Sequence, residues 1–220
     1  TPLAVLRTQL QSALRDDVPP RQALEELSAT VDRATQLANQ MLALAKVEQL
    51  RQQGDAPQQD LAQAVRAVAL DLAPLVADRA LDFDIETEPT PVRAHEWMLR
   101  ELARNLMHNA IRHLPVQGRL SLHVKARDGL AELLVADSGP GLPPGLEGRL
   151  FQAFSPGDAR TGSGLGLAIC REIVDALGGQ IALDNRVEND RVTGLDARAR
   201  LPLAQDPARD AAALQGHNRG

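Results

Sequence analysis

A carboxylate beside two glycines, in the last third of the chain, has the residue types needed to bind a nucleotide base. Asp137 ends the apolar run 130–136, which predicts a strand, and Gly139 and Gly141 follow it. A carboxylate at a strand end can accept a hydrogen bond from an exocyclic amine such as that of adenine. The glycines permit positive φ and let the backbone approach a flat ring without a Cβ in the way.

Further along, three alternating glycines precede an amphipathic helix. This loop comprises Gly162, Ser163, Gly164, Leu165, Gly166 and Leu167. Apolar residues then recur at helical spacing as far as Leu177, and Gly178-Gly179 ends the helix. The free N–H groups and the positive end of the helix dipole therefore face the loop, which suits phosphate oxygens. Either glycine cluster alone is as common in a surface turn, so a third element is needed.

That third element is a helix with amides and a cation on one face. In the run 101–113, positions 101, 105, 109 and 112 share one face, and the leucines at 99, 102 and 106 share the other. The leucine face predicts core packing. The opposite face presents Asn105, Asn109 and Arg112 to a ligand.

Together these elements resemble, in order, the nucleotide-binding boxes of the sensor histidine kinases. The matching residues are Asn105 and Asn109 (N box), Asp137, Gly139 and Gly141 (G1 box), Phe151 and Phe154 (F box), and Gly162, Gly164 and Gly166 (G2 box). The resemblance covers residues 101–167. It implies the Bergerat ATP-binding fold of the GHKL superfamily, an α/β sandwich shared with gyrase, Hsp90 and MutL.

The resemblance implies ATP and Mg²⁺ as ligands and assigns roles to single residues. Asn109 matches the asparagine that places the metal on the polyphosphate, Arg112 a phosphate contact, and His113 an aromatic position near the base. Residues 142–161 match the ATP lid, in which Arg160 is the candidate for a charge that relatives carry at the position of Ser155-Pro156. The plainer interpretations are solvated helix surface for the first three residues and core packing for Phe151 and Phe154.

Position 105 distinguishes between branches of the superfamily. The ATP-hydrolysing members resemble one another in a glutamate four residues before the metal asparagine, where it can polarise water. This chain has Asn105, which cannot act as a base. A histidine acceptor is therefore favoured over water.

Residues 1–52 predict two helices joined by a proline break at 16–20. The second helix, from Arg21 to Gln52, carries an apolar heptad that a single hairpin cannot bury. A four-helix bundle from two chains buries it, so we predict a homodimer.

The start of the chain, Thr1-Pro-Leu-Ala, resembles the end of the H box of histidine-phosphotransfer domains. The alignment places the phospho-accepting histidine four positions before Thr1, so that it is absent from this sequence. Thr1 matches the residue that orients water when such enzymes dephosphorylate a response regulator.

We expect an α+β fold in four parts. These are a dimerisation and phosphotransfer hairpin (1–52, incomplete at its N-terminus), a polar linker (53–60), a catalytic ATP-binding domain with the Bergerat α/β sandwich (61–203), and a flexible tail (204–220). Within the third part the pattern predicts helices over 61–78 and 94–113, strands near 81–86, 120–124 and 130–136, and a closing hairpin of 180–183 with 192–201.

Composition excludes some functions. The 220 residues are 44% hydrophobic and 24% charged, as in a globular protein, and the net charge of -5 argues against nucleic-acid binding. Cys170 is the only cysteine, which excludes an intrachain disulfide and fits a reducing cytoplasm. No apolar run is long enough to span a bilayer, so membrane attachment is expected only through upstream segments of a parent anchored at the inner face of a bacterial membrane.

The resemblance therefore implies the ATP-dependent protein-histidine kinase core of a bacterial two-component system. Such a core passes the γ-phosphoryl of ATP to a histidine and on to an aspartate in a response regulator receiver domain, and can also act as a phosphatase of that regulator. Two alternatives stay open at this point. One is a GHKL ATPase of the gyrase or Hsp90 kind, and the other is a non-catalytic ATP-binding scaffold.

Overall fold

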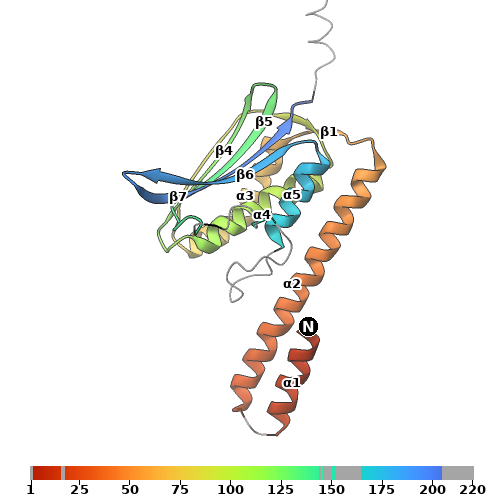
Figure 1. Cartoon of the computed structure of the whole chain (residues 1–220), viewed down its shortest axis with the longest axis vertical. Coiled ribbons are helices and arrows are strands. Elements are labelled where there is room, and N and C mark those ends of the chain that lie inside the picture. The colour runs from red at the N-terminus through yellow and green to blue at the C-terminus, as the bar shows by residue number, and fades with distance from the viewer. Residues whose placement is uncertain (1, 16–17, 144, 146–149, 152–164, 205–220) are drawn as a thin grey trace, which may run out of the picture.

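The computed structural model describes residues 2–15, 18–143, 145, 150–151 and 165–204. A helical hairpin leads into an α/β unit in which three helices cover one face of a five-stranded sheet (Figure 1). No helix in the described ranges is long and apolar enough to cross a membrane.

The hairpin consists of α1 (Pro2–Leu14) and α2 (Pro20–Gln53), which lie side by side. Proline at the first position of α2 fits the fixed φ of a helix start, and Gly54, with φ of 79°, ends the helix. The Thr30 hydroxyl donates to Gln9 Oε1 at 3.0 Å and ties the two helices together. Several large apolar side chains of the hairpin stay exposed: Leu10, Leu14, Leu24, Met41 and Leu42.

The main sheet is mixed, with strand order β2-β4-β5-β7-β6. Its strands are β2 (Asp82–Thr87), β4 (Arg119–Arg127), β5 (Leu130–Asp137), β6 (Gln180–Glu188) and β7 (Arg191–Pro202). Among the strand pairs described for this sheet, β2–β4 is parallel and the others are antiparallel. Both hairpin turns place two successive residues at positive φ, Asp128-Gly129 and Asn189-Asp190, which matches the right-handed twist of the strands.

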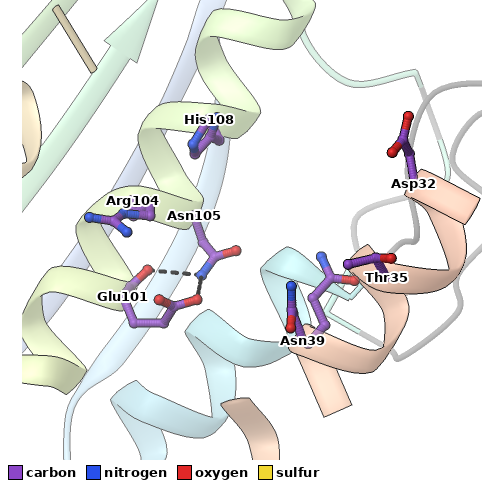
Figure 2. Close-up of a pocket in the computed structure, with 8 residues that line it drawn as sticks. Asp32, Thr35, Asn39, Glu101, Arg104, Asn105 and His108 are labelled. Carbon is purple, nitrogen blue, oxygen red and sulfur yellow. Dashed lines mark hydrogen bonds between the residues drawn. The ribbon is translucent and has the colours of Figure 1, made fainter. Parts of the chain in front are cut away.

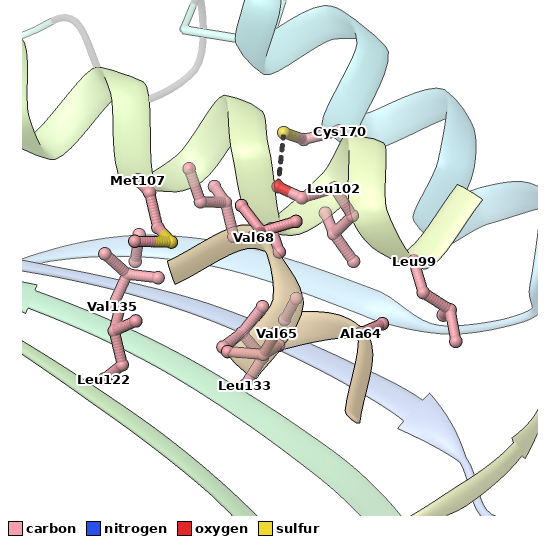
Figure 3. Close-up of a cluster of buried hydrophobic side chains, with 14 of the residues drawn as sticks. Ala64, Val65, Val68, Leu99, Leu102, Met107, Leu122, Leu133, Val135 and Cys170 are labelled. Atoms are coloured by element: carbon pink, nitrogen blue, oxygen red, sulfur yellow. Dashed lines mark hydrogen bonds between the residues drawn. The ribbon is translucent and has the colours of Figure 1, made fainter. Parts of the chain in front are cut away.

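One face of the sheet is covered by α3 (Leu61–Asp78), α4 (Glu96–His113) and α5 (Gly166–Ala176). Their apolar faces meet the sheet in one continuous core (Figure 3), which includes Val65, Val68, Leu99, Leu102, Met107, Leu122, Leu133 and Val135. The sheet also carries ion pairs such as those of Glu132 with Arg198 (3.5 Å) and Arg200 (2.6 Å). Buried residues alternate with more exposed ones over residues 119–124 of β4 and 130–135 of β5, as expected for a sheet covered on one face.

The segment expected to be a linker is partly a strand. Residues Gln58–Asp60 form β1, which pairs antiparallel with β3 (Pro91–Arg93). Asp60 Oδ1 stabilises this junction because it accepts from the N–H groups of Ala62 (3.1 Å) and Thr90 (2.9 Å). The first of these bonds also caps α3.

The second half of α2 contacts the α/β unit. Ala43 and Val47 are buried, and Lys46 Nζ lies 4.3 Å from the ring centroid of Trp97 at the start of α4. The hairpin is therefore packed against the helix that carries the predicted amide face.

The guanidinium of Arg79 holds the end of α4 in place. Its Nη1 donates to the carbonyl oxygens of Ile111 (2.8 Å) and Leu114 (3.2 Å), at the negative end of the helix dipole. We expect Arg79→Ala to lower the free energy of unfolding by about 1–2 kcal/mol in urea titrations. Arg119→Ala is the control, because that side chain is 71% exposed in its pair with Asp82 and its loss should cost about 0.5 kcal/mol or less. Equal losses in the two variants would contradict this role for Arg79.

Candidate functional site

Two hydrogen bonds within α4 orient the side chain of Asn105 on the predicted amide face. Asn105 Nδ2 donates to the carbonyl oxygen (2.8 Å) and to Oε1 (2.9 Å) of Glu101 (Figure 2). With its nitrogen committed in this way, the Asn105 side chain presents Oδ1 to its surroundings. A Cβ built on Gly166 would lie 3.1 Å from this oxygen, so α4 meets the first residue of α5 here.

A polar cavity of about 340 Å³ lies between α2 and this face of α4. Figure 2 shows its two walls, with Asp32, Thr35, Asn39 and Gln40 from α2 and Glu101, Arg104, Asn105 and His108 from α4. Desolvation and the Arg104 guanidinium lower the pKa of His108, which favours its neutral form at pH 7. The cavity opens the amide face of α4 toward the helical hairpin.

The predicted base site is formed at the end of β5. Asp137 is only 4% exposed, and the Gly139 N–H donates to its Oδ1 at 2.7 Å. A Cβ on Gly139 would lie 3.5 Å from the carbonyl oxygen of His113, so the end of α4 borders this loop. The structure therefore brings the end of the helix that carries the N box next to the G1 box.

The two glycines of this loop serve different needs. Gly141 has φ of 73°, as predicted. Gly139 does not have positive φ, and that part of the prediction is wrong. It is needed instead for close approach, because a Cβ there would lie 2.8 Å from Asp137 Oδ1.

Burial raises the pKa of the Asp137 carboxyl, although the backbone N–H groups of Gly139 and Leu195 and the charges of Arg186 and His113 oppose the shift. The folded protein thus holds this proton more tightly than the unfolded chain does. Stability should fall as the pH rises from the ordinary carboxyl pKa through the raised one, and the cost is complete above it.

Asp137→Asn keeps the shape and the acceptor for Gly139 but has no charge to bury. We expect the unfolding temperature of Asp137→Asn, relative to the unsubstituted protein, to be higher at about pH 7.5 than at about pH 4. Thermal unfolding at several pH values measures this difference. A difference that does not change with pH would show that burial of the charge carries no cost.

The predicted glycine loop enters the described residues at Leu165, which is buried, and α5 starts at Gly166 with Leu167 half-buried. Cys170 lies in the core, where its Sγ donates to the Leu102 carbonyl at 3.9 Å. Burial raises the pKa of this thiol, so Cys170 is a core residue whose thiol stays protonated.

Other predicted residues are only partly accounted for. Asn109 and Arg112 are half-buried on α4, and His113 is exposed at its last position. Phe151 is partly buried against the core, and the Arg171 guanidinium lies 4.6 Å from its ring centroid. The remaining predicted residues lie outside the described ranges: Thr1, Phe154, Ser155, Pro156, Arg160, Gly162, Ser163 and Gly164.

Sequence reasoning missed the residues of β6 and β7 that contact the base loop. Asn185 and Arg186 hydrogen-bond to its backbone, and Gly194 packs against Asp137. They lie more than 40 residues beyond the loop, in a strand pair without a recognisable motif. A glycine inside the alternating pattern of the closing hairpin was the one available signal, because a strand glycine often marks close backbone approach.

Comparison with known proteins agrees with this geometry. Residues 94–205 match the family described as histidine kinase-, DNA gyrase B-, and HSP90-like ATPase. The sensor protein kinase PmrB of Pseudomonas aeruginosa is 33% identical over 218 residues, which are 94% of this chain and 44% of PmrB. The chain thus spans less than half the length of that relative.

Two solved structures show the same fold. The structure of the mycobacterial sensor histidine kinase MprB aligns with a TM-score of 0.61 at 27% identity. The alignment covers 69% of this chain and 99% of the MprB chain. The histidine kinase ThkA, solved in complex with the response regulator protein TrrA, aligns with a TM-score of 0.71 at 21% identity. This alignment covers 93% of the present chain and 58% of the matched chain.

Proposed function

Because the chain belongs to the histidine kinase-, DNA gyrase B- and HSP90-like ATPase family, and aligns along most of its length with a sensor kinase, we propose that it is the core of a sensor histidine kinase. It transfers the γ-phosphoryl of ATP to a histidine and then to an aspartate of a response regulator. The observation that carries this proposal is the convergence on α4, where Asn105 meets the start of α5 and His113 meets the Asp137 loop.

The convergence gives each part of ATP a matching surface. The Asp137 carboxylate accepts from the adenine amine, and the glycines beside it admit the ring. The free N–H groups at the start of α5 face the phosphates. Phosphoryl transfer depends mainly on positioning and charge stabilisation, which fixed amides and a helix terminus supply.

The donor set also fits Mg²⁺. This hard cation prefers oxygen and is usually held by one or two protein ligands together with phosphate oxygens. The Asn105 amide nitrogen is already committed to Glu101, which leaves its oxygen available, and Asn109 lies one turn further along the same face. The bound metal would neutralise charge on the polyphosphate, while Asn109 and Asn105 would hold it on the side of the start of α5.

The acceptor is a histidine and not water, because no carboxylate stands at position 105. We place this histidine four positions before Thr1, on the first helix of the hairpin in a longer parent protein. Thr1 would then orient water when the same enzyme dephosphorylates its regulator. The parent would be anchored by upstream segments at the inner face of a bacterial membrane.

A second copy of the chain is the proposed partner of the hairpin. Leu14, Leu24 and Met41 are 77%, 67% and 62% exposed, which is unusual for large apolar side chains on a two-helix unit. Packing of two hairpins into a four-helix bundle would bury them. The receiver domain of a response regulator, as in the ThkA complex, is the other proposed partner.

The test is phosphorylation of a chain extended upstream through the proposed histidine. Incubation with Mg²⁺ and γ-labelled ATP should give acid-labile label on the protein, and that label should move to a receiver domain. Replacement of the upstream histidine by alanine is the control and should remove the label. Steady release of free phosphate without labelled protein would instead indicate a GHKL ATPase, and neither product would indicate an ATP-binding scaffold.

A further inference from the structure

The base loop, residues Asp137–Leu142, is held at both ends by two consecutive residues of β6. Asn185 Oδ1 accepts from the Leu142 N–H at 2.7 Å, and Asn185 Nδ2 donates to the Leu142 carbonyl at 2.9 Å. At the other end, Arg186 Nη2 donates to the Asp137 carbonyl at 2.5 Å. Both side chains are half-buried, so these bonds form partly out of water.

Arg186 is itself fixed from the neighbouring strand. Its Nη1 lies 2.9 Å from Asp196 Oδ1, in a pair whose side chains are 35% and 21% exposed. The pairing of β6 with β7 shifts register directly after Arg186. Such an irregularity redirects side chains and is common beside functional sites. The guanidinium thereby reaches across β7 to the end of β5.

The space around the loop is filled from the same strands. A Cβ on Gly141 would lie 2.5 Å from Asn185 Oδ1 and would also overlap the Val192 side chain. The loop therefore lies against β6 and β7 with no room for a side chain at this glycine. The Asn185 amide pairs with the backbone of Leu142 through one donor and one acceptor, as the backbone of a neighbouring strand would.

We propose that Asn185 and Arg186 are positioning residues for base selection, which set the place of the Asp137 carboxylate and of the glycine backbone against the ring. The inference rests on the proposed ATP-binding function. A carboxylate discriminates between an adenine amine and a guanine carbonyl only when it is held at hydrogen-bonding distance from that ring position. Neither residue touches the nucleotide, because each acts through the loop.

The experiment measures the affinity of the full chain for Mg²⁺-ATP and Mg²⁺-GTP. Asn185→Ala removes both bonds to Leu142, and Arg186→Met keeps the apolar stem of the side chain but loses the guanidinium. We expect each substitution to weaken ATP binding about tenfold and to lower the ratio of ATP to GTP affinity by a similar factor. Arg191→Met changes an exposed side chain beside the turn of the same hairpin and should leave both unchanged.

The ratio of ATP to GTP affinity separates a positioning role from a loss of stability, since partial unfolding weakens the binding of both nucleotides equally. An unchanged ratio in both variants would overturn the proposal. Hydrogen exchange at the Leu142 amide supplies a readout without nucleotide, and it should accelerate in Asn185→Ala but not in Arg191→Met. If the unsubstituted chain bound no nucleotide, the proposed function would fail, and the exchange rates would still show whether Asn185 holds the loop.

Discussion

Asn109→Ala is expected to reduce phosphoryl transfer by the upstream-extended chain roughly a hundredfold or more, the effect typical of removing one charge-stabilising group from a reaction site. Asn109 lies one helical turn beyond Asn105 on the polar face of α4. The opposite face of that helix is buried in the core, so the helix cannot rotate to offer another ligand in its place. The loss should therefore appear at all ATP concentrations.

The measurement is the rate of protein labelling as Mg²⁺ is titrated. Asn109→Asp is the matched variant, because it keeps an oxygen at the same position, and it should recover part of the rate at high Mg²⁺. The unfolding temperatures of both variants should stay close to that of the unsubstituted chain, since Asn109 is half-buried on the polar face. Full activity of Asn109→Ala would show that Asn109 has no role in phosphoryl transfer.

Gly194→Ala is expected to destabilise the α/β unit by about 2–4 kcal/mol, the range of severe core overpacking. A Cβ at this position would overlap the Asp137 carbonyl oxygen and the Arg186 guanidinium. The first obstacle is backbone, which can yield only if β5 moves away from β7. Chemical denaturation would measure the loss, and ATP affinity should fall with it because Asp137 is displaced.

Gly129→Ala provides the control for this substitution. Gly129 sits in the β4–β5 turn at φ of 77°, and a Cβ there meets nothing within 4 Å. Its replacement costs only the left-handed backbone strain, about 1–2 kcal/mol. ATP affinity should not change. A smaller loss for Gly194→Ala than for Gly129→Ala would mean that the strands separate easily at this point.

Local patterns predicted most of the α/β unit because each element depends on its own residues. The helix over 61–78 and the strands around 120–136 follow directly from apolar spacing, and the structure confirms them. The nucleotide boxes were recognisable because Asn105, Asp137 and Gly166 belong to short motifs in a known order. Composition alone showed none of this.

What the sequence did not predict depends on pairing between distant segments. The strand Gln58–Asp60 has the polar composition of a linker and is a strand only because β3 lies beside it. Asn185 and Arg186 gain their importance from the register of β6 against β7, which no local pattern encodes. The positive φ predicted for Gly139 was wrong, since whether a glycine relieves strain or admits a neighbour depends on what lies opposite.

The position of β7 in the sheet sets the order in which the site can assemble. This strand is the last in the described chain, yet it inserts between β5 and β6. A nascent chain that has emerged only as far as α5 already contains Asn105, Asp137 and Gly166, but β5 is paired with β4 alone and still lacks β7 on its other side. Adenine recognition should therefore appear late in translation and abruptly, so that ribosome-bound chains stalled before residue 191 do not retain ATP.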